Sequence, residues 1–412
     1  MDIIYNIGIK ATQLALKCTA LFNQKINLGV KGRANTFHNL KKNIKTTDQT
    51  LWFHCASLGE YEQGLPVFKK LREYYITHKI ILSFFSPSGY EIRKNSPIAD
   101  IVVYLPIDTK TNAQRFLNIV NPELTVFVKY DIWPNFLNEL KTRQLRAILI
   151  SAAFRKNQIY FQLYGKPLRK ALFAFEHIFT QNEGSKTLLE SINYTRVTVS
   201  GDTRFDRVFS QLEMDNTLNF IDEFKDNKTC IVSGSTWPED ENLFIDFINS
   251  PASKNVKFII APHTVKANQI QSLQEKLNTE VVLFSNKDKK NLKHAQVFIL
   301  DTIGLLTKVY KYADIAYVGG AMGNTGLHNT LEPAVFGVPI IIGNHYEKFP
   351  EAKALIENGG MFSISNQIEF NHILSILIEN QENRQQLGLK NLTYIKNNKG
   401  AVVQILDYLL KL

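Results

Sequence analysis

The chain has 412 residues, and at roughly 150 residues per domain this length predicts two or three domains. Hydrophobic residues make up 44% and charged residues 21%, ordinary globular values that exclude disordered, collagen-like and coiled-coil chains. The three cysteines, Cys18, Cys55 and Cys230, form no CxxC pair, which excludes a disulfide scaffold and a thiolate zinc site. Their spacing fits a reducing compartment.

The net charge of +10 is concentrated at the N-terminus. Residues 1–50 contain eight basic and two acidic residues, a net charge of +6, which leaves +4 for the other 362 residues. An enzyme that acts on nucleic acid more often distributes its basic residues along a groove in the body of the fold. The distribution therefore does not favour nucleic acid as a partner.

These basic residues flank an apolar segment from Ile3 to Phe22. Polar and basic residues interrupt the segment, so it is poorly suited to span a bilayer, and it lacks the core and cleavage site of a signal peptide. As a helix it would carry one apolar stripe, formed by Ile4, Ile7, Ala11, Leu14, Cys18 and Leu21. Such a stripe with flanking lysines favours a helix on an anionic membrane surface; a helix packed against the protein's own core is the alternative.

From residue 51 onward, short apolar runs alternate with amphipathic stretches, which is the pattern of βα units on a parallel sheet. The first series of predicted strands covers 51–55, 79–85, 101–104, 124–128 and 147–150. The second series covers 230–233, 256–261, 281–284, 297–300, 315–318 and 339–342. The pattern predicts two doubly wound α/β domains that face a cleft, with ligands at the carboxyl ends of the strands.

The domain boundaries follow from these two series. We expect a membrane-associated segment over 1–33, a first Rossmann-like domain over 34–210 and a second over 229–390. The polar stretch 211–228 is predicted to be a linker, and 391–412 to be a C-terminal helix.

The run from His54 to Glu60 directly follows the first predicted strand. Ser57 and Glu60 have the spacing of a capping box, in which the serine accepts a backbone N–H and the glutamate reaches back. A carboxylate in this loop would also point into the cleft, where it could remove a proton from an acceptor hydroxyl. Gly59 would let an acceptor approach the backbone closely.

Two further strand ends in the first domain carry charged side chains. Lys129 and Asp131 follow the strand 124–128, and Pro134 suits the first turn of a helix. A salt bridge between Lys129 and Asp131 and a functional role for both remain alternatives. Arg204 has a similar place, as a cation able to bind a carboxylate or a phosphate.

In the second domain, Ser235 and Thr236 follow the first strand of the second series. Small hydroxylated residues near a helix N-terminus bind anions, or they simply cap the helix. Pro262 and His263 close the next strand. His263 could hold a leaving phosphate, stack near a base, or be an ordinary polar surface residue.

The glycine-rich run 317–334 is the strongest motif. Gly319 and Gly320 follow a strand, and such glycines allow close approach of a phosphate, with backbone amides as donors. The pattern is not GxGxxG, so it gives little support to a nicotinamide dinucleotide. His328 follows the loop, Glu332 in the next helix is placed to accept both ribose hydroxyls, and Lys348 lies in another polar loop on the same edge.

Taken together, these runs resemble the Kdo transferases, which move 3-deoxy-D-manno-octulosonic acid (Kdo) from CMP-Kdo to a lipid A precursor. The resemblance extends over nearly the whole chain, and its short runs stand in the family's order. They are SLGE ending at Glu60, SPSGYE (86–91), YLPID (104–108), GSTWPEDE (234–241), DTIG (301–304) and HNTLEPA (328–334).

The resemblance implies an inverting glycosyltransferase of the GT-B fold, with no cofactor and no protein-bound metal. The first domain would take the lipid acceptor and the second CMP-Kdo, at the cytoplasmic face of the inner membrane. The alternatives are a UDP-sugar transferase or epimerase of related fold, or a non-catalytic membrane-binding relative.

The resemblance also implies roles for single residues. Glu60 would be the catalytic base, because SLGE is similar to the family's SVGE. The implied nucleotide contacts are Asn329, Thr330, Leu331 and Glu332 at the ribose, and Pro262, His263, Ile303, Gly304 and Leu305 elsewhere. The chain departs from the family where Lys129 and Asp131 replace Glu-x-Glu, where Arg204 replaces Lys, and where Leu305 replaces Glu. Asp131 is therefore the candidate for a second carboxylate.

Overall fold

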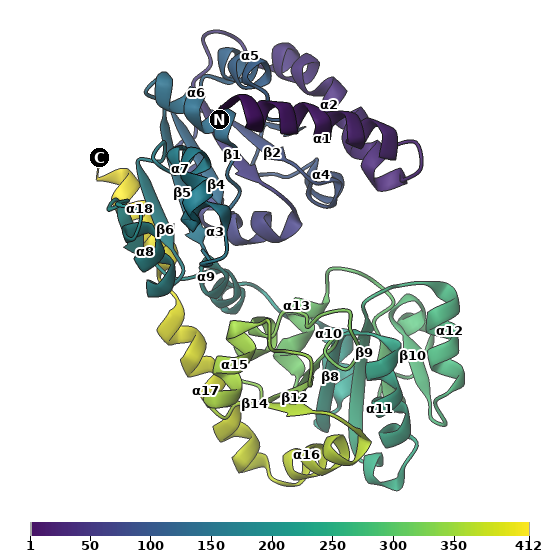
Figure 1. The fold of residues 1–412 in the computed structure, drawn as a ribbon. Helices are drawn as coiled ribbons and strands as arrows, with labels where there is room; N and C mark the ends of the chain where they lie inside the picture. The colour runs from purple at the N-terminus through teal and green to yellow at the C-terminus, as the bar shows by residue number, and fades with distance from the viewer. Residues whose placement is uncertain (1, 412) are drawn as a thin grey trace. The chain divides into compact units, whose positions relative to one another are not determined.

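The computed structural model describes residues 2–411, with the backbone alone at residues 2–4 and 167 (Figure 1). It divides into two compact units. The first contains the chain up to Arg207 and again from Lys399, and the second contains Val208–Asn398. Each unit is built on one seven-stranded sheet in which every pairing is parallel, as the alternating pattern predicts.

The sheet of the first unit has the strand order β3-β2-β1-β4-β5-β6-β7. Its strands are β1 (Thr50–Cys55), β2 (Lys79–Phe84), β3 (Ile101–Tyr104), β4 (Leu124–Val128), β5 (Arg146–Ala152), β6 (His177–Thr180) and β7 (Val197–Val199). Its helices are α1 (Asp2–Thr19), α2 (Gln24–Asn43), α3 (Leu58–Tyr74), α4 (Pro87–Arg93), α5 (Lys110–Val120), α6 (Pro134–Thr142), α7 (Lys166–Leu172), α8 (Glu183–Glu190), α9 (Thr203–Phe209) and α18 (Ala401–Leu410). The first five strands match predicted strands, whereas β6 and β7 were not predicted.

The central strand β1 is buried along its whole length because both faces of the sheet are covered. Trp52 points to one side, where it packs with Phe116, Phe127 and Phe136. Phe53 points to the other side and stacks on Phe68 of α3. This core fixes the carboxyl end of β1, from which the first candidate site begins.

The sheet of the second unit has the order β10-β11-β9-β8-β12-β13-β14. Its strands are β8 (Thr229–Thr236), β9 (Val256–Pro262), β10 (Val281–Leu283), β11 (Val297–Ile299), β12 (Ile315–Val318), β13 (Ile340–Gly343) and β14 (Met361–Ile364). Its helices are α10 (Asn219–Lys225), α11 (Pro238–Ile248), α12 (Ala267–Glu275), α13 (Leu306–Val309), α14 (Leu331–Ala334), α15 (Pro350–Glu357), α16 (Gln367–Glu379) and α17 (Gln381–Asn398). All of these strands except β14 match predicted strands.

The chain is divided differently from the predicted domains at two places. The stretch 211–228 contains α10, which packs in the second unit through buried Ile221 and Phe224. The single C-terminal helix predicted over 391–412 is the end of α17 and a separate α18, because Gly400 has φ 116 and interrupts the helix. Asp206 accepts the amides of Gly400 and Ala401, which holds the start of α18 on the first unit.

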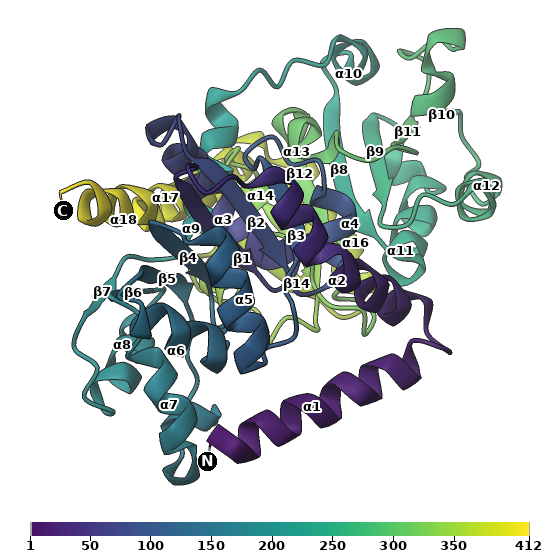
Figure 2. The same ribbon diagram turned by 90° about the horizontal axis from the view of Figure 1, so that it is seen from above.

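The N-terminal segment is helical, as predicted, and α1 lies at the edge of the first unit beside α2 (Figure 2). Of the predicted apolar stripe, Ile7 is 61% exposed, Leu14 65% and Leu21 78%. The side chain of Ile4 lies outside the described residues. The exposed stripe does not pack on the protein's own core. Among residues 2–411, no helix is long and apolar enough to cross a membrane.

Candidate active site

The first candidate site lies at the carboxyl ends of β1 and β4, which are neighbours in the sheet. Ser57, Gly59 and Glu60 follow β1, at the start of α3. Lys129 and Asp131 follow β4, before α6 begins at Pro134 as predicted. Because the two strands are parallel, both groups of side chains meet at one edge of the sheet.

Glu60 is held by two neighbours. The Ser57 hydroxyl donates to Oε2 of Glu60, and Nζ of Lys129 lies 4.0 Å from Oε1. The Glu60 side chain is 13% exposed, so it is largely enclosed but open on one side. The predicted capping box is wrong, since Ser57 makes no side-chain bond to the helix backbone. Ser57 orients the carboxylate instead.

Lys129 has φ 69, a left-handed conformation that is uncommon for a residue with a side chain. Such strained residues concentrate at functional sites, where the surrounding structure maintains them. Between the described parts of the chain there is no ion pair from Lys129 to Asp131, so that alternative is wrong. Lys129 pairs with Glu60, and Asp131 has a different partner.

Asp131 is positioned by a buried histidine. Nε2 of His54 lies 2.5 Å from Oδ2 of Asp131, and His54 is fully buried. On its other side, Nδ1 of His54 lies 2.7 Å from Oγ of Ser83, which accepts from Nε1 of Trp52. Nε1 of Trp133 also points at Nε2 of His54, over 3.0 Å, so both nitrogens of the buried ring have hydrogen-bond partners. Sequence reasoning did not give His54 a role.

Packing does not require a glycine at position 59. A Cβ built at this position would meet only Oγ of Ser57, at 3.8 Å, which is an ordinary contact. The backbone at Gly59, next to Glu60 in the chain, is therefore open to a neighbouring molecule. Arg204 lies at the start of α9, where its Nε donates to Asp202 over 2.8 Å.

The second candidate site lies at the carboxyl ends of β8, β9 and β12, which are adjacent in the second sheet. Trp237 stacks on His263 with the ring centres 4.7 Å apart, and His263 lies 4.5 Å from the ring of His328. Burial, with a smaller contribution from His263, lowers the pKa of His328 to about 4. A neutral His328 accepts from Nε1 of Trp237 through Nε2, at 3.3 Å.

Asp240 ties the glycine-rich loop to the start of α11. Its buried carboxylate accepts the amides of Trp237 and Gly320 and the hydroxyl of Tyr317, at 2.9, 2.9 and 2.7 Å. Desolvation raises the pKa of this carboxyl above its usual value. Neither Ser235 nor Thr236 caps α11, because Asp240 does so, and Thr236 donates to Glu241 instead.

The amides of Gly319 and Gly320 are therefore not the expected phosphate donors. Gly319 donates to the carbonyl of Gly234 and Gly320 to Asp240. Within the described chain, the amides of Met322, Gly323 and Asn324 have no internal acceptor, so this part of the loop holds the available donors. Gly319 is needed for packing, since a Cβ there would lie 2.5 Å from the carbonyl oxygen of Ser235.

Of the four predicted ribose contacts, Asn329 and Glu332 have polar side chains that bind each other, whereas Thr330 and Leu331 are buried. Nδ2 of Asn329 donates to Oε1 of Glu332 over 3.0 Å, and α14 places Glu332 in its first turn. The side chains of Thr330 and Leu331 are 1% and 0% exposed, and their contact with the nucleotide stays a prediction.

The remaining predicted residues are in loops on the same edge of the sheet. Pro262 ends β9, Ile303 and Gly304 are exposed in the loop after β11, and Lys348 is exposed after β13. Leu305 is half-buried directly before α13. No cluster of three or more His, Cys, Asp or Glu suited to a metal occurs within residues 2–411.

The amino-acid sequence is similar to that of a known protein family. Residues 30–207 match the family described as 3-deoxy-D-manno-octulosonic-acid transferase (kdotransferase). The Haemophilus influenzae 3-deoxy-D-manno-octulosonic acid transferase is 26% identical over 88% of this chain and 86% of its own length. The Aquifex aeolicus enzyme of the same name is 25% identical over 80% of this chain and 86% of its own length.

Solved structures show the same fold at low sequence identity. UDP-GlcNAc 2-epimerase from Neisseria meningitidis superposes with a TM-score of 0.59 at 14% identity, over 88% of this chain and all of that one. MurG from Acinetobacter baumannii gives 0.54 at 13% identity, over 89% of this chain and all of that one. The two Rossmann-like sheets thus form the expected GT-B fold. Residues 30–207 belong to the family of 3-deoxy-D-manno-octulosonic-acid transferases, and the chain is a glycosyltransferase.

Proposed function

We propose that this enzyme transfers Kdo from CMP-Kdo to a lipid A precursor (lipid IVA), in lipopolysaccharide core biosynthesis. The observation that carries the proposal is the arrangement at Glu60, a carboxylate oriented by Ser57 and Lys129 beside open space at Gly59. A base that must accept a proton from a bulky acceptor needs both a fixed orientation and a free approach.

In the proposed reaction, Glu60 removes the proton of the acceptor's primary hydroxyl. The hydroxyl oxygen attacks the anomeric carbon of Kdo from the face opposite the phosphate, so the configuration inverts. The bond between that carbon and the phosphate oxygen breaks, and CMP departs with the electron pair. Asp131, fixed by His54, is the second carboxylate on the acceptor side.

The second unit supplies the donor site in this proposal. The stack of Trp237, His263 and His328 offers aromatic faces for a base, and Glu332 with Asn329 offers acceptors and donors for a ribose. The free amides over 322–324 and the cation of Lys348 suit the negative charge that builds on the leaving phosphate.

We further propose that α1 attaches the enzyme to the cytoplasmic face of the inner membrane. Leu14 and Leu21 project from the helix at 65% and 78% exposure, and Phe22 is 90% exposed just beyond it. Lys10 and Lys17 are exposed on the same helix, which suits an anionic lipid surface.

Leu14→Glu should abolish flotation with anionic vesicles. Ile368→Glu, which changes a still more exposed side chain in α16, should float like the wild type. Equal flotation of both variants would refute the attachment.

The transfer itself is tested with Glu60→Gln, labelled CMP-Kdo and lipid IVA, with the products identified by mass spectrometry. Loss of a general base predicts a rate about 10²–10⁴-fold lower. Glu73→Gln, in the same helix but exposed, is the matched control and should keep the full rate. A Glu60→Gln variant with wild-type rate would overturn the assignment of the base. Protection of the melting temperature by UDP but not CMP would instead favour a UDP-sugar enzyme.

A further inference from the structure

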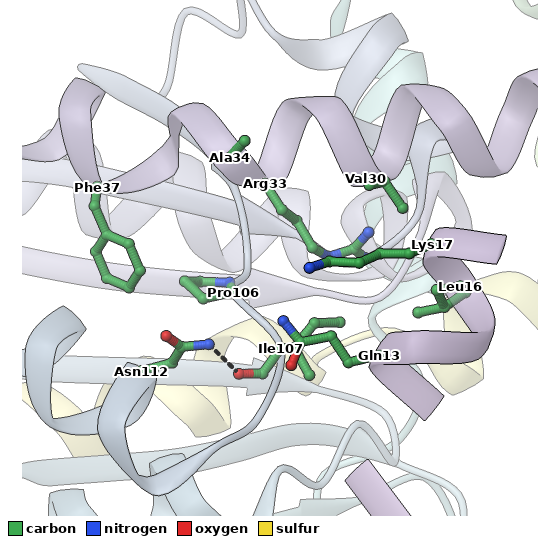
Figure 3. Close-up of a pocket in the computed structure, with 10 residues that line it drawn as sticks. All are labelled: Gln13, Leu16, Lys17, Val30, Arg33, Ala34, Phe37, Pro106, Ile107 and Asn112. Atoms are coloured by element: carbon green, nitrogen blue, oxygen red, sulfur yellow. Dashed lines mark hydrogen bonds between the residues drawn. The ribbon is translucent and has the colours of Figure 1, made fainter. Parts of the chain in front are cut away.

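A pocket of about 330 Å³ lies beneath α1, away from both candidate sites. Its walls come from α1, from α2, from the segment between β3 and α5, and from the first turn of α5 (Figure 3). The lining residues are Gln13, Leu16, Lys17, Val30, Arg33, Ala34, Phe37, Pro106, Ile107 and Asn112. Neither the candidate catalytic residues nor the predicted nucleotide contacts reach this pocket.

The pocket is positively charged. Lys17 and Arg33 both extend into it, from α1 and α2 respectively (Figure 3), and none of the lining residues is acidic. Arg33 donates to the carbonyls of Phe85 and Leu105 and lies over the ring of Phe85, at 4.4 Å. Neither cation has a carboxylate partner in the part of the chain that the structure describes. Two cations without a counter-ion favour an anionic ligand.

Burial lowers the pKa of Arg33 to about 10, so the guanidinium remains protonated at neutral pH. The rest of the lining is largely apolar, with Leu16, Val30, Phe37 and Ile107 around the charged groups. A site that combines a pair of cations with an apolar wall suits an amphiphile, whose anionic group binds the cations and whose alkyl chain contacts the wall.

We propose that this pocket binds one anionic phospholipid of the bilayer. The phosphate lies between Lys17 and Arg33, and the upper part of one acyl chain lies against Leu16 and Phe37. The volume is near the lower limit of about 300–1,000 Å³ for small-molecule sites, which suits a headgroup and part of one chain. A tetra-acylated disaccharide such as the acceptor would not fit.

The proposal rests on the attachment of α1 to the membrane. Leu14 on the outer side of α1 is exposed, while Leu16 and Gln13 on the inner side line the pocket. If the outer side lies in the lipid surface, the inner pocket is at the level of the headgroups. A lipid in the pocket would contact α1 and α2 together and so hold α1 against the rest of the first unit.

The same lipid would stabilise the segment that leads to the candidate active site. Asp108, next to the lining residue Ile107, accepts the hydroxyl of Tyr5 in α1 over 2.7 Å. Its carboxylate also accepts the amides of Asn135 and Phe136 at the start of α6, each over 3.0 Å. Because α6 begins three residues after Asp131, the position of α1 affects the position of the Asp131 carboxylate through Asp108 and α6.

Binding of soluble short-chain lipids to the full-length protein tests the proposal by calorimetry. Dihexanoyl phosphatidylglycerol, as monomers, should bind saturably with one site per chain, and dihexanoyl phosphatidylcholine should bind more weakly. Lys17→Gln should weaken the phosphatidylglycerol about fivefold, the effect of one basic residue near a lipid phosphate. Lys42→Gln, the same change at an exposed lysine of α2 outside the pocket, should have no effect. Equal binding of the two lipids, or equal effects of the two variants, would overturn the proposal.

Two further experiments distinguish a phospholipid from inorganic phosphate and from the lipid acceptor as the ligand of the pocket. Inorganic phosphate should bind far more weakly than the lipid; equal affinity would exclude a role for the acyl chain and refute the phospholipid assignment. In detergent without phospholipid, Lys17→Gln and Lys42→Gln should show the same KM for the lipid acceptor. A selective rise in KM for Lys17→Gln would assign the pocket to the acceptor instead. Lipid binding is measured without turnover, so a failure of the proposed transfer reaction remains distinguishable.

Discussion

Replacing Gly59 with alanine tests whether the space beside Glu60 is reserved for a ligand. The added Cβ would contact only Oγ of Ser57, at 3.8 Å, and Gly59 is not among the glycines with positive φ. It is the second residue of α3, where alanine is intrinsically favoured over glycine by up to about 1 kcal/mol. We therefore expect Gly59→Ala to leave the free energy of unfolding unchanged or to raise it by up to about 1 kcal/mol.

The activity should change in the opposite direction. If the acceptor reaches Glu60 across Gly59, the new methyl group displaces it, and a displacement of about 1 Å costs about 100-fold in rate. We expect kcat/KM for the acceptor to fall about 100-fold, measured as initial rates with saturating CMP-Kdo, while the melting temperature is kept.

Gly184→Ala provides a matched control for this experiment. Gly184 is also the second residue of its helix, α8, and a Cβ there meets only Oδ1 of Asn182, at 3.5 Å. This variant should keep both stability and activity. A fully active Gly59→Ala enzyme, or one destabilised by more than about 1 kcal/mol, would refute the reasoning.

Three other changes test the two sites. His54→Phe leaves Ser83 and Asp131 without their buried partner and should cost about 1–3 kcal/mol in urea unfolding; an unchanged midpoint would contradict the network. Lys129→Met should lower kcat, but not further when Glu60→Gln is already present; additive losses would show that the two residues act separately. Burial keeps His328 neutral in the folded protein down to about pH 4, whereas the unfolded chain takes up a proton below about pH 6.5, so the wild type loses stability over this range. His328→Asn should reduce that loss, measured as the free energy of unfolding in denaturant titrations at each pH. Identical pH profiles of the two proteins would refute this.

The strands that sequence patterns identified are those with continuous apolar runs. The exceptions, β6, β7 and β14, have three or four residues each. All three residues of β7 are half-buried, as are Phe362 and Ser363 in the edge strand β14. An edge strand is covered by a neighbour on one side only, so it does not need the uninterrupted apolar run by which a central strand is recognised.

The pairing of Glu60 with Lys129 was beyond sequence reasoning for a topological reason. The two residues follow β1 and β4, and the strand order places β4 rather than β3 beside β1. From the sequence, a salt bridge between Lys129 and Asp131 was one of two alternatives, because those residues are only two positions apart. The sheet order decides otherwise, since it carries Lys129 to Glu60 and brings Asp131 to His54.

The glycine-rich loop shows why a motif identifies a site more readily than the atoms that act in it. Its glycines predicted the close approach of a phosphate, but the group that approaches Gly319 is the carbonyl of Ser235, within the protein. Asp240, one turn into another helix, takes the amide of Gly320, so the donors left for a phosphate lie further along, at 322–324. It follows that Gly319→Ala should damage folding before it affects nucleotide binding, whereas a change at Asp240 should displace the loop and weaken both.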